Sequence, residues 1–547
     1  MRNFIPVLIL VAVLISCSKY PVADQVVFGK TWTGDDSKPW AEAFAIVGDS
    51  VVAVGSLEEI EKWVGPNTKK IETAESNLIV PGFIDCHTHF MEGGFALSSV
   101  QLRDARTPQE FINRIKAFAL TQPKGQWIIS GDWDHENWGG ELPTKEWIDS
   151  VTADNPIWIN RLDGHMSLAN SLALKLAGIT DQVKNIEGGT IVRDKNGRIT
   201  GVLKDNAMNL VNQVVPDFSD EQKDKALIAA MNYVAAQGVT SIHNMSGYMD
   251  VFERAHKQNN LITRIYAGMM LSDWKVLNAK IADQGRGDKW LRIGGLKEFV
   301  DGSLGSHTAA FFKPFTDSPN DSGFFITSES DLYTRIKSAD SAGLQVMTHA
   351  IGDKAIRTLL NIYKRVEDEN GNRDRRFRIE HAQHITPQDF SRFAELNVIP
   401  SVQPYHAIDD GRFAEKLIGA ERIKTTYAFG SLLSAHARLV FGSDWFVAPP
   451  IPLYGIYAAV TRQTLDDKNP NGWVPEQKIS VEDALKCYTI RAAYASFEEN
   501  IKGSIEPGKL ADFVILEKNL FEIDPSEIRE VKVITTTVGG NLVYSNN

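Results

Sequence analysis

The sequence predicts an α/β protein built on a (β/α)₈ barrel of the TIM type, with a small composite β-sandwich domain and an inserted subdomain. Three observations support this prediction. Short apolar strands alternate with amphipathic helices along most of the chain, eight such strands can be counted, and further short strands with glycine turns occur at both ends. Alternating apolar strands and helices imply a parallel sheet covered on both faces. Eight strands are the number that closes a barrel with a packed interior.

The first residues are predicted to be an export signal. Arg2 precedes an apolar run over residues 4–15, which is too short to cross a bilayer core of roughly 30 Å. The run ends in Leu14-Ile15-Ser16-Cys17, which resembles the lipobox of bacterial lipoproteins, where cleavage leaves the cysteine as an acylated N-terminus. We therefore expect a lipoprotein signal peptide over residues 1–17, lipidation of Cys17, and an exported protein in the bacterial cell envelope, periplasmic or on the outer surface. An ordinary signal peptide with a chance cysteine is the alternative.

The two ends of the mature chain are expected to form one β domain, over residues 23–80 and 500–547. The expected strands are residues 26–28, 43–47, 51–55, 511–516, 531–538 and 541–544. Neither end has enough strands for an independent sheet, so the two sets are paired.

The barrel is expected over residues 81–499. Its eight strands are predicted to end near His89, His243, Met269, Asp301, His349, His381, Gln403 and Asp444. Helix and strand alternate as in the segment from Ser219, where a capping box with Gln222 starts a helix that leads to a strand at Val239. Residues 102–215 are too long for a single βα unit. They are predicted to be a lid subdomain over the barrel mouth, with a type I′ hairpin turn at Asn196-Gly197.

Composition limits the function classes. The net charge of −11 argues against a nucleic-acid partner, because phosphate binding needs clustered Lys and Arg. Three cysteines cannot build a disulfide framework in a chain of 547 residues. Cys86 and Cys487 are expected to be buried in the helix layer and the core. The expected partner is a small-molecule substrate, with membrane contact through the lipid anchor alone and homo-oligomerisation left open.

Histidines and one aspartate fall at the predicted strand ends. His87 and His89 lie two residues apart on one strand, so their side chains share a face and can hold one metal ion. His349 and His381 lie 32 residues apart, about one βα unit, and Asp444 follows 63 residues later, about two units. Barrel enzymes place their active sites at this end of the strands. The sequence therefore predicts a metal site, with satisfied core histidines as the alternative.

At these positions the chain resembles the amidohydrolase superfamily, in the branch that includes N-substituted formamide deformylases (metal-dependent amidohydrolase family 3). The resemblance runs from about residue 25 to the end. It is carried by the motif Pro81-Gly82-Phe83-Ile84-Asp85-Cys86-His87-Thr88-His89 and by the segments 296–306, 349–353, 378–383, 442–444 and 503–512.

The resemblance implies a pair of divalent metal ions. It assigns His87, His89 and Asp444 to one ion, His349 and His381 to the other, and a carbamylated Lys297 as the bridge between them. His384 is a second choice for His381, and a lysine that snorkels at a strand end is the alternative for Lys297. Zinc is the expected ion because imidazole-rich sites suit it, with iron, manganese and nickel left open.

The reaction implied is hydrolysis of a non-peptide carbon–nitrogen bond, with N-substituted formamides among the candidate substrates. A water between the two ions would lose a proton and attack the carbonyl. Asp444, the expected catalytic residue, would take the proton and pass it to the leaving nitrogen. Hydrolysis of esters or cyclic amides on the same site, and a non-catalytic member of the fold, are the competing hypotheses.

Residues near the mouth are candidates for substrate contacts. Arg161 and His165 in the insert, and His406 after a barrel strand, are predicted to bind substrate. A structural histidine is the alternative for His165, and a packed loop residue is the alternative for His406. Three further side chains are candidates for pocket lining, with a packed loop residue as the alternative in each case: Trp133, Trp138 and His307. His243 also ends a strand and is predicted to be pocket wall, since the resemblance assigns no metal ligand there.

Overall fold

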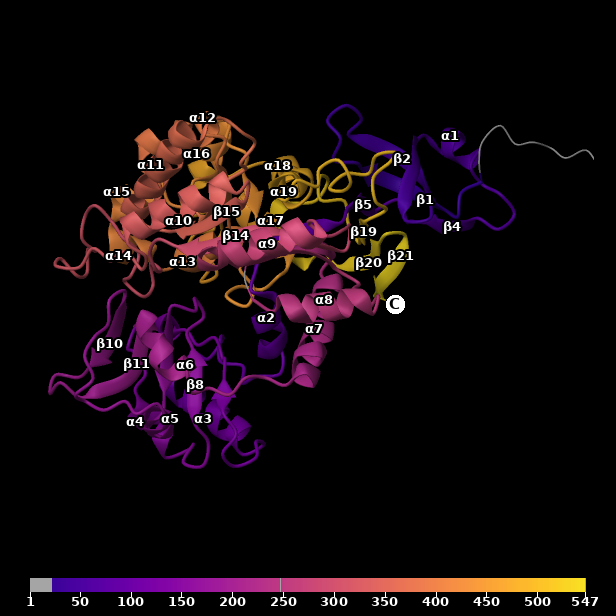
Figure 1. Ribbon diagram of the computed structural model, residues 1–547. Coiled ribbons are helices and arrows are strands. Elements are labelled where there is room, and N and C mark those ends of the chain that lie inside the picture. The colour runs from indigo at the N-terminus through magenta and orange to yellow at the C-terminus, as the bar shows by residue number, and fades with distance from the viewer. Residues whose placement is uncertain (1–21, 246, 547) are drawn as a thin grey trace, which may run out of the picture.

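The computed structural model describes residues 22–245 and 247–546, and its largest element is a parallel β-barrel (Figure 1). Neighbouring strands pair in chain order. The strands are β6 (Phe83–Thr88), β12 (Val239–Asn244), β13 (Arg264–Met270), β14 (Leu291–Phe299), β15 (Gln345–Ala350), β16 (Arg378–His381), β17 (Ile399–Val402) and β18 (Val440–Phe441). The last strand returns to the first, where Asp444 N donates to His87 O at 2.7 Å and His89 N donates to Trp445 O at 2.6 Å. The predicted eight-stranded barrel is confirmed.

Helices cover the outside of the barrel. The principal ones are α7 (Asp220–Ala235), α8 (Met249–Lys257), α9 (Trp274–Gln284), α10 (Glu329–Ser341), α11 (Asp353–Asn370), α12 (Phe390–Glu395), α16 (Phe429–Ser434), α17 (Pro452–Thr461), α18 (Val481–Tyr488) and α19 (Ile490–Ala495). Helix α7 begins with the predicted capping box of Ser219 and Gln222. In α11, buried side chains recur at helical spacing, as at Ile356, Leu359 and Tyr363, so one stripe of the helix packs onto the sheet.

Short helices follow several strands at the open end of the barrel. They are α2 (Phe90–Ala96), α13 (Pro404–Asp410), α14 (Ala414–Ile418) and α15 (Ala420–Ile423). Cys86 and Cys487 are both buried, as predicted. Cys86 packs with Ile399, Val440 and Ala492, which places it between a barrel strand and helix α19.

The strands at the two chain ends form one sheet. In the order of pairing they are β21 (Asn541–Ser545), β20 (Val533–Val538), β19 (Phe513–Leu516), β5 (Leu78–Pro81), β1 (Gln25–Trp32), β2 (Trp40–Val47) and β3 (Ser50–Gly55), and β4 (Lys69–Glu72) pairs with β1. The rings of Phe44 in β2 and Phe513 in β19 lie 5.2 Å apart. These strands are three positions apart in a sheet with a spacing of about 4.8 Å, so the sheet folds over itself and encloses an apolar core.

The elements from α3 to α6, in the part of the chain between β6 and β12, form the separate lobe at the lower left of Figure 1. A five-stranded sheet contains β10 (Gly189–Arg193), β11 (Ile199–Asp205), β9 (Met166–Ala169), β8 (Ile157–Asn160) and β7 (Ile128–Ile129), in that order. Its helices are α3 (Pro108–Ala119), α4 (Lys145–Asp149), α5 (Ser171–Leu176) and α6 (Asn209–Asn212). The lobe has its own apolar clusters, so it is a folded unit and not an extended loop.

The predicted hairpin joins β10 to β11, but the predicted turn type is wrong. Gly197 has a φ of +80°, whereas Asn196 does not have a positive φ, and a type I′ turn needs both. The connection is longer than two residues and is held by Asp194, whose Oδ1 accepts hydrogen bonds from the backbone N–H groups of Asn196 and Arg198. The carboxylate of Asp194 therefore stabilises this turn, and the Asn196-Gly197 dipeptide alone does not indicate it.

The predicted signal peptide and Cys17 lie outside the described residues. Within residues 22–245 and 247–546, no helix has both the length and the apolar character needed to cross a bilayer.

Candidate metal centre

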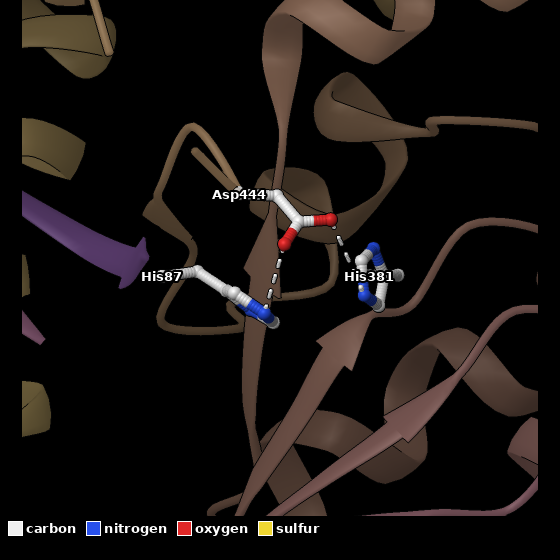
Figure 2. Close-up of side chains that lie close together, drawn as sticks. All are labelled: His87, His381 and Asp444. Carbon is white, nitrogen blue, oxygen red and sulfur yellow. Dashed lines mark ion pairs between the residues drawn. The ribbon is translucent and has the colours of Figure 1, made fainter. Parts of the chain in front are cut away.

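A carboxylate and three imidazoles meet at the open end of the barrel. Asp444 lies in the loop after β18, with Oδ1 3.3 Å from His87 Nε2 and 3.4 Å from His89 Nε2. Its other oxygen lies 4.0 Å from His381 Nε2. Figure 2 shows Asp444 between the rings of His87 and His381. The ligand atoms of these three residues all lie within 4.8 Å of one another.

The remaining predicted ligands lie beside this cluster. The ring centroids of His349 and His381 are 4.4 Å apart, and Lys297 Nζ is 3.1 Å from His87 Nε2. Lys297 is 1% exposed inside the barrel, so the alternative of a lysine snorkelling to solvent is wrong. All six residues predicted as ligands therefore converge on one place.

Backbone geometry explains how β16 contributes to the centre. Along a strand, Arg378 and Glu380 share one face, and the next residue would point to the other. His381 instead has a φ of +71°, a conformation that non-glycine residues rarely adopt. The chain turns there, so Glu380 and His381 both face the interior. Asp444 has a similar φ of +62°, and such strain is common at functional sites.

Hydrogen bonds fix which ring nitrogen of each histidine remains available. His87 Nδ1 lies 2.7 Å from Glu380 Oε2, and His349 Nε2 lies 3.0 Å from the carbonyl oxygen of Gly302. A ring nitrogen that donates to such an acceptor leaves the lone pair of the other for an ion. Burial holds the pKa values of His87 and His349 well below the ordinary value, which keeps both rings neutral.

Glu380 is itself held by a buried arginine that the sequence reasoning did not assign to the site. Arg378 Nε lies 2.7 Å from Glu380 Oε1. The same guanidinium donates to Cys86 O at 2.6 Å and to Ser401 Oγ at 3.0 Å. Arg378 and Glu380 are each 0% exposed. The signal in the sequence was the pair of charged residues at alternate positions just before His381, on a strand whose inner face should be apolar.

The residues fit a divalent ion. Asp444 Oδ1 and His381 Nδ1 are buried and have no hydrogen-bond partner among the described residues. Unsatisfied buried polar atoms are costly, and a bound cation would satisfy the carboxylate oxygen. Neutral imidazoles and carboxylates are the donors that zinc and related ions take.

A partly open cavity of about 40 Å³ lies against the centre. Its wall combines His349, His381 and Asp444 with the three residues predicted to bind substrate, Arg161, His165 and His406. The ring of His165 lies 5.1 Å from that of His349. Its Nδ1 lies 2.7 Å from Asp205 Oδ1, a contact that the sequence reasoning missed because Asp205 lies 40 residues away.

Arg161 lines the cavity but already has several partners. Its Nη1 is 2.7 Å from Asp163 Oδ2, and its Nη2 is 3.2 Å from Asp134 Oδ1. Asp163 in turn accepts hydrogen bonds from Ser303 Oγ and Ser306 Oγ of the barrel. Arg161 thus links the insert to the barrel at the cavity wall.

Several residues considered near the mouth do not reach the cavity. Trp133 is fully buried and donates Nε1–H to Ile159 O. Trp138 packs in the same insert core, 5.5 Å from the Phe111 ring, and His307 contacts Asp317. The hypothesis that these side chains line the pocket is wrong, since position on a loop does not give the direction of a side chain.

Two further histidines lie elsewhere. The prediction that His243 forms pocket wall is wrong, because it lies inside the barrel with Nδ1 3.0 Å from Arg378 Nη1 and does not line the cavity. His384, the second choice for His381, has Nδ1 2.8 Å from Thr426 Oγ1. It is not in the cluster with His87 and Asp444.

The chain was compared with known protein families and with known proteins. A sequence-family model described as "Amidohydrolase family" matches residues 72–544. Protein LONG AFTER FAR-RED 3 of Arabidopsis thaliana is 40% identical over 96% of this chain and 92% of its own length. The N-substituted formamide deformylase of Arthrobacter pascens is 27% identical over 94% of this chain and 96% of its own.

A solved structure agrees with the fold. An uncharacterized metal-dependent hydrolase from Pyrococcus horikoshii OT3 superposes with a TM-score of 0.74 at 26% identity, covering 92% of this chain and 99% of the other. The family match and the relatives agree with the barrel and with the residues gathered at its open end. The chain belongs to the amidohydrolase superfamily, in the family 3 branch of metal-dependent hydrolases that its motifs predict.

Proposed function

We propose that this protein hydrolyses a non-peptide carbon–nitrogen bond, with N-substituted formamides as the first substrate class to test. The observation that carries the proposal is the convergence of His87, His381 and Asp444 within 4.8 Å, beside a small cavity. The complete ligand set favours an enzyme over a non-catalytic member of the fold. The name of the formamide deformylase that matches over 94% of the chain supports the bond type.

The residues divide into two ligand groups. In this proposal His87, His89 and Asp444 hold one divalent ion, expected to be zinc, and His349 and His381 hold the other. Such ions lower the pKa of a water molecule and polarise a carbonyl group.

Lys297 would bridge the two groups as a carbamate. An ammonium group would repel two cations, whereas a carbamate supplies anionic oxygen. Burial lowers the pKa of the Lys297 amine to about 8, so a substantial neutral fraction, the form that reacts with carbon dioxide, is present near neutral pH.

Asp444 is assigned the proton transfers. Its Oδ1 faces His87 and His89 and is assigned to the ion, so Oδ2, 4.0 Å from His381 Nε2, is the oxygen assigned to accept the proton of the attacking water and to return it to the departing nitrogen. His165, oriented by its contact with Asp205, and His406 both border the cavity, and are assigned to hold the substrate. Arg161 is assigned to shape that wall through Asp163.

The proposal is tested with zinc-loaded protein and a panel of formamides, acyl amino acids, lactams and esters. Turnover of an acyclic amide, together with about two metal ions per chain by elemental analysis, is expected. Less than one ion per chain and no amide turnover would refute the proposal, and a preference for esters or lactams would replace it. Arg198→Gln is the control, because the side chain of Arg198 is 68% exposed. This variant should have the metal content and the turnover of the wild type after the same zinc loading.

The N-terminal motif supports a separate proposal about location. We infer that the protein is exported and anchored in the bacterial cell envelope through an acylated Cys17. The apolar run before Ser16 and Cys17 supports it. A small molecule remains the proposed partner.

A further inference from the structure

Two adjoining hollows lie between the insert and the barrel. The inner one is the cavity of about 40 Å³ beside the metal centre. The outer one has a volume of about 480 Å³ and is bordered by Arg103 and Arg412, among others. Leu162 and Asp409 line both hollows, so the two meet at these side chains.

The inner cavity limits the group that can sit at the metal centre. One buried water needs roughly 10–15 Å³ of such volume, so the cavity has room for about three waters. Part of this space is needed for the ions and the attacking water. What remains favours a small acyl group such as formyl over a branched or long one, because Leu162 and the ligand residues His349, His381 and Asp444 line the cavity.

The outer hollow is large enough for the rest of a substrate, since small-molecule sites commonly measure roughly 300–1,000 Å³. Its wall is rich in charged side chains, and most of the carboxylates there are already paired. Asp134 lies 3.0 Å from Arg412 Nη2, Asp104 contacts Arg114, and Asp466 lies 3.0 Å from Lys468. A charged wall of this kind suits a polar amine portion better than an exclusively apolar one.

Arg103 differs from the other charged residues of the outer hollow in having a buried donor without a hydrogen-bond partner among the described residues. Its Nη2 is buried and has no hydrogen-bond partner among the described residues. The carboxylate of Asp409 is 3.9 Å away, beyond hydrogen-bonding distance, and is already engaged by Arg412. A guanidinium group with an unused N–H favours an anionic ligand, because charge-assisted hydrogen bonds to carboxylate or phosphate are the strong ones.

We propose that the substrate is an amide with a small acyl group, formyl or acetyl, whose amine portion carries an anionic group that Arg103 binds in the outer hollow. The inference rests on the proposed function, because it assumes that the bond to be cleaved lies in the inner cavity. It adds where each part of the substrate lies. The acyl group occupies the inner cavity and the charged amine portion occupies the outer hollow, with Leu162 between them.

The test uses zinc-loaded protein and N-formyl derivatives of ω-amino acids of increasing chain length, each paired with the neutral alkylformamide of the same shape. A formylated aminoalkyl phosphate distinguishes phosphate from carboxylate. At the best chain length, kcat/KM is expected to exceed that of the neutral partner about tenfold or more. Acetyl derivatives should be slower, and butyryl derivatives slower still.

Two substitutions assign these effects to residues. Arg103→Gln is expected to remove the advantage of the anionic substrates, mainly through KM, and to weaken binding of the amino-acid product in titration calorimetry. Arg198→Gln, an exposed arginine of the same insert, should change neither. Leu162→Ala should raise kcat/KM for the butyryl amide relative to the formyl amide.

The outcomes separate the two proposals. Equal turnover of the neutral and anionic partners, or an Arg103→Gln variant that keeps the preference, would overturn the inference and leave amide hydrolysis standing. Preference for butyryl over formyl substrates in the wild type would overturn it as well. If no amide of the series is hydrolysed, the proposed function fails and the inference fails with it.

Discussion

Replacing the carboxylate that holds His87 should weaken metal binding. Glu380 Oε2 lies 2.7 Å from His87 Nδ1, so it fixes the tautomer that leaves Nε2 for an ion. Substitution of such an outer partner typically costs 10–100-fold in metal affinity, which corresponds to roughly 1.4–2.7 kcal/mol. For Glu380→Gln we expect zinc affinity to fall within that range, measured by competition with a chromophoric chelator.

The same substitution also breaks the buried contact between Glu380 and Arg378, 2.7 Å long. Removing one member of a buried ion pair costs about 3–5 kcal/mol of stability, so folding must be checked by circular dichroism and urea unfolding before affinity is compared. The double variant Arg378→Gln/Glu380→Gln removes both charges and should recover part of that stability while zinc affinity stays low.

Glu58→Gln, whose side chain is 91% exposed in the β domain, is the control. A folded Glu380→Gln protein that binds zinc as tightly as the wild type would refute the argument that Glu380 positions His87.

Three further predictions follow from the same residues. Asp444→Asn should remain folded by circular dichroism and lose at least about 10²-fold in kcat, and wild-type rates would remove Asp444 from the proton transfers. Burial lowers the pKa of Lys297 from 10.5 to about 8, so between these values the unfolded chain binds more protons, and the stability of metal-free protein gains from Lys297 as pH rises through that window. In urea unfolding across pH 8 to 10.5, Lys297→Met should therefore show a smaller rise than the wild type, and identical slopes would contradict the burial argument. Radiolabelled palmitate should enter the wild type in a bacterial host but not Cys17→Ala, and equal labelling would rule out acylation at that residue.

The barrel and the histidines at its strand ends could be predicted because both depend on local patterns, whereas the place of Lys297 among the ligands came from the family resemblance. Strand length, alternation and the repeat length of βα units place His87, His349 and His381 at strand ends without any knowledge of distant contacts. Asp205 and Glu380 were not predicted as partners of histidines, because those contacts depend on the register of residues that are 40 and 293 positions apart.

The wrong predictions have a different physical origin. Trp133 and His307 were considered for the pocket because they lie in loops near the mouth, but the direction of a loop side chain depends on what packs beneath it. Trp133 is drawn into the core of the insert, where Ile159 O accepts its N–H. The turn type at Asn196-Gly197 was wrong because the carboxylate of Asp194 stabilises a longer connection through the backbone N–H groups of Asn196 and Arg198.

The charged interior of the barrel argues for a role of Arg378 and Glu380 beyond stability. Barrels of this type are normally filled with branched apolar side chains, and a buried ion pair is often no more stable than well-packed apolar residues. Here Arg378 and Glu380 are each 0% exposed, and the chain also adopts a strained φ of +71° at His381, which costs about 1–3 kcal/mol. Neither feature is needed to close the barrel. Both set the geometry of adjoining ligands, since Glu380 orients His87 and the turn at His381 brings that ring to Asp444. The free-energy cost of burying Arg378 and Glu380 and of straining His381 is therefore best explained by the preorganisation of the metal centre.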